Sequence, residues 1–161
     1  MSSEDKLAVL QTVVKIEVHY LGLPYDELPL SAKTFPTSDT FTIAQYAHND
    51  KTIRLNIKSL DLLDPYDLVG SVCHECWHAH QRAQIEAYNS MDERFKDLYA
   101  FDHIQTMIEE FANYDDGKTD FAAYAEQYVE ATARAYGDMS KEEYRETIEE
   151  YISNGLRFDE H

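Results

Sequence analysis

Basic residues are scarce in this chain of 161 residues, in which 14 Lys and Arg are outnumbered by 31 Asp and Glu, so that the net charge is −17. A field of this sign repels the phosphate backbone of nucleic acids and the anionic surface of a membrane. Neither is therefore expected as a partner. The field attracts basic peptides and proteins, although solubility alone also explains it. We expect a peptide or protein substrate, with basic ones favoured by the charge.

Cysteine is scarce as well, since Cys73 and Cys76 are the only two. A small secreted domain held together by disulfides needs more. Long apolar runs are also missing. No stretch approaches the roughly 20 residues that span a membrane, and residues 1–6 lack the basic and apolar segments of a signal peptide. These absences predict a cytoplasmic protein.

Glycine and proline are too few to build a linker, at five and four residues. The chain also shows no internal repeat and no low-complexity segment. Hydrophobic residues make up 43 % of it, which is enough for a packed core. We therefore expect one domain spanning residues 1–161.

The first part of the chain predicts a helix followed by a β-hairpin. Apolar residues at helical spacing begin after Ser3 and end at Gly22. Residues 23–40 hold three of the four prolines and are expected to form an irregular crossing. Alternating apolar residues over 41–45 and 53–57 then predict two half-buried antiparallel strands, because residues 48–51 supply the turn.

The remainder of the chain predicts helices, which makes the fold class α+β. Asp64 is a good N-cap and Pro65 suits the first helical position, so a helix is expected from there to about Tyr88. Three further helices are predicted from cap residues: one begins at Ser90 with Glu93, one runs from Thr119 to Gly137 after a break at 115–117, and one runs from Ser140 with Glu143 to Asn154.

The sequence His74-Glu75-Cys76-Trp77-His78 lies inside the helix that begins at Pro65. Positions four apart on a helix project about 40° from each other, so both imidazoles can reach one metal ion. Glu75 projects about 100° from His74 and flanks that metal, where a general base for a zinc-activated water belongs. The motif predicts a zinc site on the face of this helix that carries His74 and His78.

The other side of the same helix is apolar. Val72, Cys76, Ala79 and Ala83 follow one another at spacings of four, three and four. This stripe predicts burial against the core, which would fix the orientation of the two histidines. Cys76 is accordingly expected to be a small buried hydrophobe and not a redox or metal-binding thiol.

A catalytic zinc ion takes three protein ligands and one water, so a third ligand must come from elsewhere in the chain. Acidic residues on the predicted helix from Thr119 are the candidates. Glu130 is favoured because it shares a stripe with the small residue Ala133, which would allow close packing against the motif helix. Glu126 and Asp120 remain open as alternatives.

The motif of His74 to His78, followed by Glu130-Ala131-Thr132-Ala133-Arg134-Ala135-Tyr136, resembles the small gluzincin-type zinc metallopeptidases. That family carries His-Glu-x-x-His on one helix and Glu-x-x-Ala-x-x-aromatic on a later one. The resemblance covers about residues 64–137 and the preceding hairpin. It implies a zincin-like fold, a Zn²⁺ cofactor held by His74, His78 and Glu130, and Glu75 as the catalytic base. It also implies that a strand near the site pairs with an extended substrate.

Other polar residues are given lesser roles. His80 projects about 200° from His78 and cannot share its metal. His103 is expected to be a surface histidine. Tyr136 is slightly favoured among the tyrosines as a donor to a reaction oxyanion, and Arg134 is either beside the site or solvated.

The sequence thus predicts a zinc-dependent hydrolase that cleaves a peptide bond. The alternative is a binding or regulatory domain that keeps the same scaffold with a structural metal or none. An intact Glu75 favours the enzyme, because a structural site does not need that carboxylate.

Overall fold

The computed structural model of the chain describes residues 1–37, 39, 42–99, 103–114, 117 and 120–155. Its elements in chain order are α1 (Ser3–Tyr20), β1 (Leu30–Lys33), β2 (Ala44–Ala47), β3 (Thr52–Asn56), α2 (Ile57–Leu62), α3 (Pro65–Asn89), α4 (Glu93–Lys96), η1 (Asp97–Tyr99), α5 (Ile104–Ala112), α6 (Phe121–Glu126) and α7 (Tyr128–Ser153). A mostly helical chain with one small sheet confirms the α+β class.

Helix α1 begins where the sequence predicts. The Ser2 hydroxyl accepts a hydrogen bond from the Asp5 amide at 3.1 Å, and the Asp5 carboxylate accepts one from the Ser2 amide at 3.4 Å. This reciprocal pair satisfies two amides that the helix itself leaves without partners. Leu10 and Val14 then bury one face of the helix in the core.

The sheet has the strand order β1-β3-β2. Strands β2 and β3 are antiparallel, which confirms the predicted hairpin. The expectation of an irregular crossing is wrong for β1, which pairs in parallel with β3 and places Leu30 opposite Ile53. Four residues are too few to show a periodic pattern, and the partner strand is distant in sequence. Phe41, expected in the hairpin, lies outside the described residues.

The second predicted strand ends one residue earlier than expected, because Ile57 begins α2. The Asn56 side chain accepts a hydrogen bond from the Lys58 amide at 3.1 Å and so caps this helix. Within the strand, Ile53 and Leu55 are fully buried, as the alternating pattern predicts.

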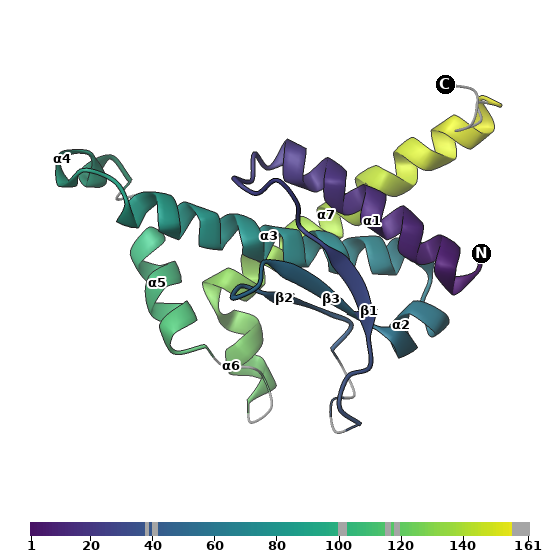
Figure 1. Cartoon of the computed structure of the whole chain (residues 1–161), viewed down its shortest axis with the longest axis horizontal. Helices are drawn as coiled ribbons and strands as arrows, with labels where there is room; N and C mark the ends of the chain where they lie inside the picture. The colour runs from purple at the N-terminus through teal and green to yellow at the C-terminus, as the bar shows by residue number, and fades with distance from the viewer. Residues whose placement is uncertain (38, 40–41, 100–102, 115–116, 118–119, 156–161) are drawn as a thin grey trace.

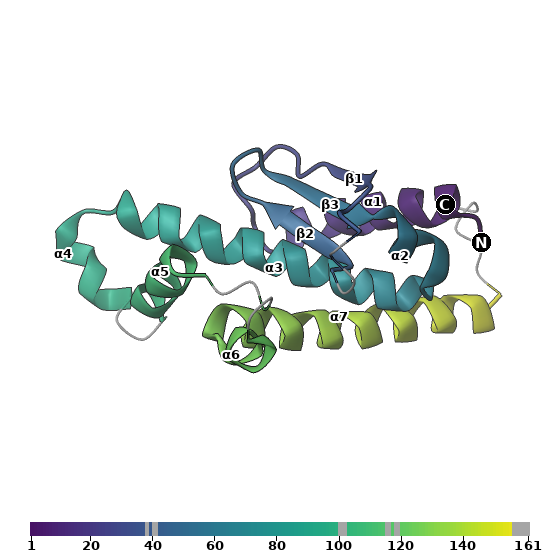
Figure 2. The same ribbon diagram turned by 90° about the horizontal axis from the view of Figure 1, so that it is seen from below.

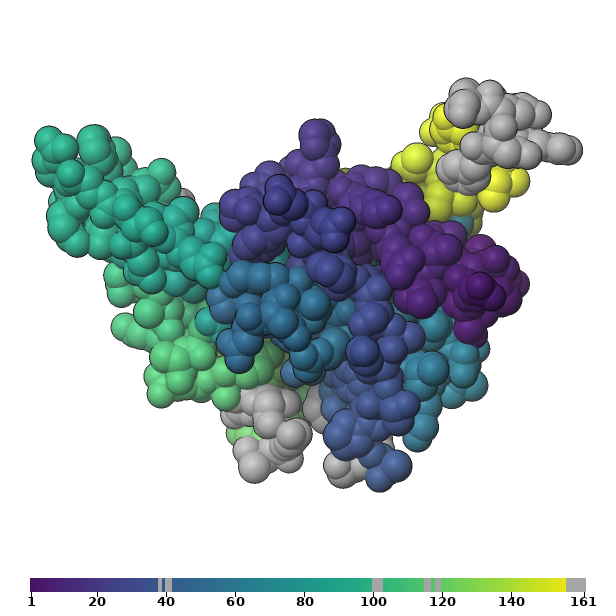
Figure 3. Space-filling view, in the orientation of Figure 1, coloured from purple at the N-terminus to yellow at the C-terminus, as the bar shows by residue number. Residues whose placement is uncertain are grey.

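Helix α3 is the central element, as expected for the motif helix. Asp64 accepts a hydrogen bond from the Tyr66 amide at 2.9 Å, which confirms the predicted cap. In Figure 1, α3 runs along the sheet, and Figure 2 shows the sheet on one side of α3 and α7 on the other. The space-filling view shows the end that carries α4 and the end of α7 projecting at opposite sides (Figure 3).

Two of the predicted caps in the second half are wrong. Ser90 is the C-cap of α3, and the cap of α4 is Asp92, which accepts from the Arg94 amide at 3.0 Å. Ser140 does not begin a helix, because α7 continues through Gly137 and Ser140 is buried inside it. Thr119 and the first two residues of the predicted break at 115–117 lie outside the described residues, whereas Gly117 has a φ of 75° and belongs to no helix.

No helix in the described part of the chain combines the length and the apolar character needed to cross a membrane. This agrees with the absence of long apolar runs in the sequence.

Helices α3 and α7 make their closest approach at two glycines. A Cβ atom built on Gly137 would lie 2.6 Å from the Gly70 carbonyl oxygen and 3.2 Å from the His74 Cβ. Gly137 is thus required by the crossing and is not a helix end. The same crossing brings the first turns of α7 beside the two histidines of α3.

We expect Gly137→Ala to destabilise the protein by about 1–2 kcal/mol. Alanine favours a helix by about 1 kcal/mol over glycine, but its Cβ meets a backbone carbonyl that cannot rotate away, and such overpacking costs about 1–3 kcal/mol or more. Thermal and urea denaturation of the metal-free protein measure the change.

Asp138→Ala is the matched control, because Asp138 is the exposed neighbour on the same helix. Its effect should stay within about 0.5 kcal/mol. Equal stability of the Gly137→Ala and parent proteins would show that the two helices can separate without cost.

Candidate metal centre

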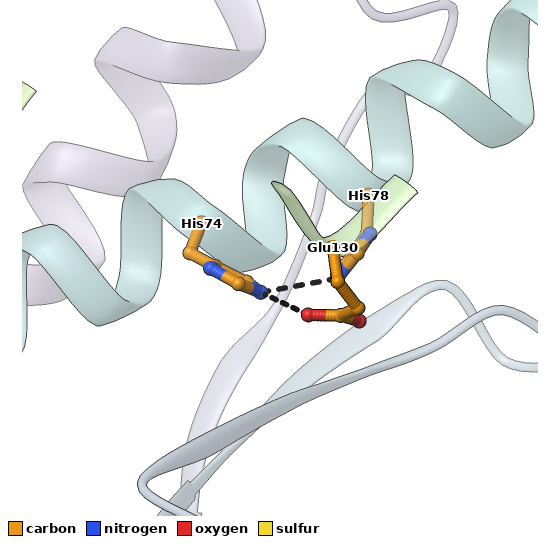
Figure 4. Close-up of side chains that lie close together, drawn as sticks. All are labelled: His74, His78 and Glu130. Atoms are coloured by element: carbon orange, nitrogen blue, oxygen red, sulfur yellow. Dashed lines mark hydrogen bonds and ion pairs between the residues drawn. The ribbon is translucent and has the colours of Figure 1, made fainter. Parts of the chain in front are cut away.

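His74 and His78 lie one turn apart on α3, as the motif predicts. Their Nε2 atoms are 3.1 Å apart, and both rings point to the same side of the helix (Figure 4). His78 is buried and His74 is partly exposed. Burial of the apolar stripe on the other side holds the helix in this orientation, since Val72, Cys76 and Ala79 are fully inaccessible to solvent.

Glu130 meets these histidines from the first turn of α7. Its Oε2 is 3.2 Å from His74 Nε2, and its Oε1 is 3.0 Å from His78 Nε2. The three ligand atoms all lie within 4.8 Å of one another. Two imidazoles and one carboxylate form a donor set that suits zinc, so this cluster can hold a divalent ion.

The start of α7 is held in place by a carboxylate from α5. Glu110 accepts hydrogen bonds from the Tyr128 amide at 2.8 Å and the Val129 amide at 2.9 Å. These amides belong to the first turn, where a helix leaves its N–H groups without partners and carries partial positive charge. Glu110 therefore caps the N-terminus of α7 from another helix and fixes the turn that carries Glu130.

Glu130 is almost completely buried, with 1 % of its surface exposed. Tyr124 donates a hydrogen bond to Oε2 at 2.8 Å, and Tyr114 donates one to Oε1. Burial acts to raise the pKa of Glu130, but the hydrogen bonds with His74, His78 and Tyr114 outweigh it and hold the pKa far below its ordinary value. The residue is therefore a carboxylate, the form that binds a metal ion.

Glu75 lies beside the cluster without belonging to it. Its Oε1 is 4.0 Å from His74 Nε2, and its Oε2 accepts a hydrogen bond from the Tyr46 amide of β2 at 2.7 Å. Burial raises the pKa of Glu75, and the nearby histidines act in the opposite direction. A carboxyl group held next to a metal site, with a pKa above its ordinary value, is a stronger proton acceptor than a free carboxylate and can return the proton.

Gln81 is a buried residue that the sequence did not single out. Its Oε1 is 2.8 Å from His78 Nδ1, and its amide nitrogen donates to the Val129 carbonyl at 3.1 Å and to the Thr132 hydroxyl at 2.9 Å. An Oε1 acceptor keeps a proton on His78 Nδ1. The proton on Nε2, which donates to Glu130, is then the one that a bound metal ion would replace. Its position three residues after a ligand histidine is the only sequence signal for this role.

Tyr114 and Tyr124 were likewise not assigned to the site from the sequence. They lie 16 and 6 residues from Glu130, on segments whose relation to α7 only the fold establishes. Burial raises the pKa of both hydroxyls, so they remain protonated donors.

The two alternative third ligands lie away from the histidines. Asp120 caps α6 by accepting from the Ala123 amide at 3.0 Å, and Glu126 is exposed. Among the described residues, the group of donors that can hold a metal contains Glu130 and neither of these.

Tyr136 and Arg134 also point elsewhere. The Tyr136 hydroxyl donates to the buried Glu17 of α1, and its ring stacks on Trp77 with centroids 4.6 Å apart. Arg134 donates to the Ala125 carbonyl at 3.0 Å. The geometry therefore gives no support to Tyr136 as a donor to a reaction oxyanion.

His80 and His103 do not join the cluster, as expected. The His80 ring packs on Trp77 with centroids 4.9 Å apart, and the exposed His103 ring stacks on Tyr128 at 4.7 Å. Cys73 and Cys76 are free and buried, and burial raises the pKa of both thiols, which agrees with the expected hydrophobic role of Cys76.

A cleft of about 310 Å³ opens beside the cluster, between the β2 hairpin, α3 and α5. Glu75 and His78 line it together with Tyr46, Arg82 and Tyr114. The candidate metal centre therefore lies at the wall of a space that can receive part of a larger molecule.

The fold and the site together define an α+β protein with a His/His/Glu cluster of metal-binding character. Comparison with known proteins finds similarity to proteins called SprT-like. The chain is 25 % identical over 114 residues to one from Bacillus cereus (strain AH187), covering 71 % of this chain and 72 % of that protein. It is 27 % identical over 94 residues to one from Bacillus anthracis (strain A0248), covering 58 % and 59 %.

The aligned segment of the longer match spans the motif residues of this chain. A segment of 114 residues in a chain of 161 necessarily contains residues 48–114, and so His74, Glu75 and His78. No protein-family model and no solved structure matches the chain. The similarity found is to SprT-like proteins, and it is distant.

We expect Gln81→Leu to weaken zinc binding about 10- to 100-fold, the usual effect of removing a group that orients a ligand histidine. Leucine fills a similar volume but leaves His78 Nδ1 without its acceptor. Competition against a chromophoric zinc chelator measures the affinity.

Gln84→Leu makes the same exchange one turn later on α3 and should leave the affinity unchanged. If both variants bind zinc equally well, Gln81 serves packing and does not orient His78.

Proposed function

We propose that the chain is a zinc-dependent metallopeptidase, a single zincin-like domain that hydrolyses a peptide bond in a peptide or protein substrate. One observation carries the proposal: two histidines of a His-Glu-x-x-His helix meet one buried carboxylate, with Glu75 held beside them. The distant similarity to SprT-like proteins, whose aligned region spans the motif residues of this chain, supports the proposal.

In this proposal His74, His78 and Glu130 hold the zinc ion, whose chemistry when bound is to polarise the scissile carbonyl and to acidify a water molecule. Glu75 takes the proton from the attacking water and delivers it to the leaving nitrogen. Its hydrogen bond with the Tyr46 amide directs one oxygen away, so the other is left for proton transfer.

The count of donors favours catalysis over a structural metal. Structural zinc sites take four protein ligands, whereas catalytic sites take three and keep one position open. Within the described residues the cluster contains three donors, and Glu75 is engaged with β2. This supports the enzyme over the alternative of a non-catalytic binding or regulatory domain.

The edge of β2 supports an extended substrate in the adjacent cleft. In an antiparallel pair, alternate residues direct their backbone groups away from the partner strand. The Asn56 amide donates to the Ile43 carbonyl at 2.8 Å, so Ala44 and Tyr46 direct theirs to the outer edge, where Glu75 meets the Tyr46 amide. A peptide lying along this edge would pass the cluster.

Tyr114 is the best-placed donor to the oxyanion of the reaction. Its side chain lines the cleft, whereas Tyr136 is not among the residues that line it and donates its hydroxyl proton to Glu17. Burial raises the pKa of Tyr114, so its proton is retained at neutral pH. The structure shows that proton donated to Glu130, so the hydroxyl would have to turn from Glu130 to the oxyanion during the reaction.

We expect Glu75→Gln to keep one zinc ion per chain and to lose peptide cleavage by a factor of about 10² or more, because it removes the proton acceptor and leaves the ligands. Glu130→Gln should lose most of the zinc as well. Elemental analysis of the purified proteins and cleavage of a peptide library measure the two properties.

Glu126→Gln is the matched control for Glu130→Gln, because it makes the same exchange at an exposed position that the sequence leaves open as a ligand. It should bind zinc and cleave like the parent. Cleavage at parental rate by Glu75→Gln would remove Glu75 from the mechanism, and a parent protein that binds zinc without cleaving any peptide would support the binding-domain alternative.

A further inference from the structure

Arg82 is a cation in the cleft beside the candidate metal centre. It lies four residues after His78, so it is about 6 Å further along α3. Its side chain is partly buried and lines the same cleft as Glu75 and His78. The guanidinium sits over the Phe111 ring of α5, with Cζ 3.8 Å from the ring centroid. A cation–π contact of this kind holds the group in place and leaves its N–H donors available.

The expected partner of Arg82 on the same helix is already engaged. Glu86 is one turn away, the spacing at which an Arg–Glu pair usually forms. Its Oε1 instead lies 3.1 Å from Lys51 Nζ and 3.0 Å from His48 Nε2. In the part of the chain that the structure describes, no carboxylate lies within ion-pair distance of the Arg82 guanidinium, and no hydrogen bond engages it.

The charges around the cleft also leave Arg82 unbalanced. The two positive charges of a zinc ion at the cluster would offset the negative charges of Glu75 and Glu130. Burial lowers the pKa of Arg82, but a guanidinium stays protonated at neutral pH. The negative charge of Glu86 acts on Arg82 but is shared with Lys51, so two cations beside the cleft have one carboxylate between them.

From this geometry we infer that Arg82 binds a carboxylate of the substrate, within about two residues of the bond that is cleaved. The estimate follows from the rise of about 3.3 Å per residue in an extended peptide, against the 6 Å between His78 and Arg82 along the helix. The planar guanidinium suits a carboxylate because it can donate two parallel hydrogen bonds. This assignment rests on the proposed peptidase function and reverses the preference for basic substrates that net charge alone suggests.

Two sources of that carboxylate have the same chemistry, an acidic side chain within the peptide and its free C-terminus. The test uses three fluorescent decapeptide pools of neutral residues: one with a central Glu and an amidated end, one with Gln in its place, and the Gln pool with a free C-terminal carboxylate. Binding is measured by anisotropy to Glu75→Gln protein loaded with one equivalent of zinc, so that affinity is read without turnover.

The Glu pool, the free-carboxylate pool or both should bind about tenfold more tightly than the neutral pool, the usual contribution of a hydrogen bond to a charged group. Adding Arg82→Gln should reduce the ratio of the affinities for the carboxylate pool and the neutral pool to about one. Adding Arg82→Lys should keep part of it, because the charge remains while the paired donors are lost. The pool that is preferred identifies the source of the carboxylate.

Arg145→Gln is the matched control, because it removes the same charge from an arginine on α7 that pairs with Glu142 at 3.4 Å. The Arg145→Gln protein should still bind the carboxylate pool about tenfold more tightly than the neutral pool. Equal binding of all three pools to the Glu75→Gln protein with Arg82 intact would overturn the role of Arg82. A carboxylate preference that persists in the Arg82→Gln variant would also overturn the role of Arg82. Circular dichroism checks that this variant is folded.

The outcome for the peptidase function is read separately, from zinc content and library cleavage by the parent protein. Cleavage without a carboxylate preference would contradict the role of Arg82 alone. A carboxylate preference in a protein that never cleaves would contradict the peptidase function and leave Arg82 as a ligand-binding residue.

Discussion

The close crossing of α3 and α7 is the constraint on which the candidate site depends. The two backbones approach so closely at Gly70 and Gly137 that a single added carbon would collide with a carbonyl oxygen. This approach places the first turns of α7 against the side of the motif helix that carries His74 and His78. Without it, Glu130 would not lie within 3.2 Å of both histidines, and the chain would present two histidines and no third donor.

The crossing also imposes an electrostatic demand, because it buries a carboxylate. An isolated charge in such a place is costly. Glu130 is stabilised by two imidazoles and two tyrosine hydroxyls, so every oxygen has partners. A divalent ion would take the place of the contacts between Glu130 and the histidines, and Tyr124 would continue to hold the carboxylate. The site is in this sense organised before any metal arrives.

The supporting groups come from several elements that are distant in sequence. Glu110 of α5 fixes the start of α7, Gln81 of α3 orients His78, and the edge of β2 holds Glu75. The cleft and its cation Arg82 are formed where these same elements meet. The proposed chemistry and the proposed substrate preference therefore depend on one arrangement of the sheet, α3 and α5 around the histidines.

Local patterns in the sequence determined the elements that carry the chemistry. Residues four apart on a helix share a face, so the positions of His74 and His78, their apolar reverse side and the Asp64 cap could be read directly. The hairpin followed from period-two alternation. Ser140 and Glu143 show where such reading fails: they match a cap pattern, but burial of Ser140 in the packed face of α7 makes the helix continuous.

Tertiary structure decided what no local pattern contains. The resemblance to a known family and the stripe shared with Ala133 favoured Glu130, but spacing within one helix does not show which carboxylate faces another helix, so Glu126 and Asp120 stayed open. Contacts between segments far apart in the chain decide three further features. These are the parallel pairing of β1, the two tyrosines that donate to Glu130, and the lack of an ion pair at Arg82 among the described residues. Such contacts are set by packing and burial of the whole fold, and these are properties that a one-dimensional pattern does not carry.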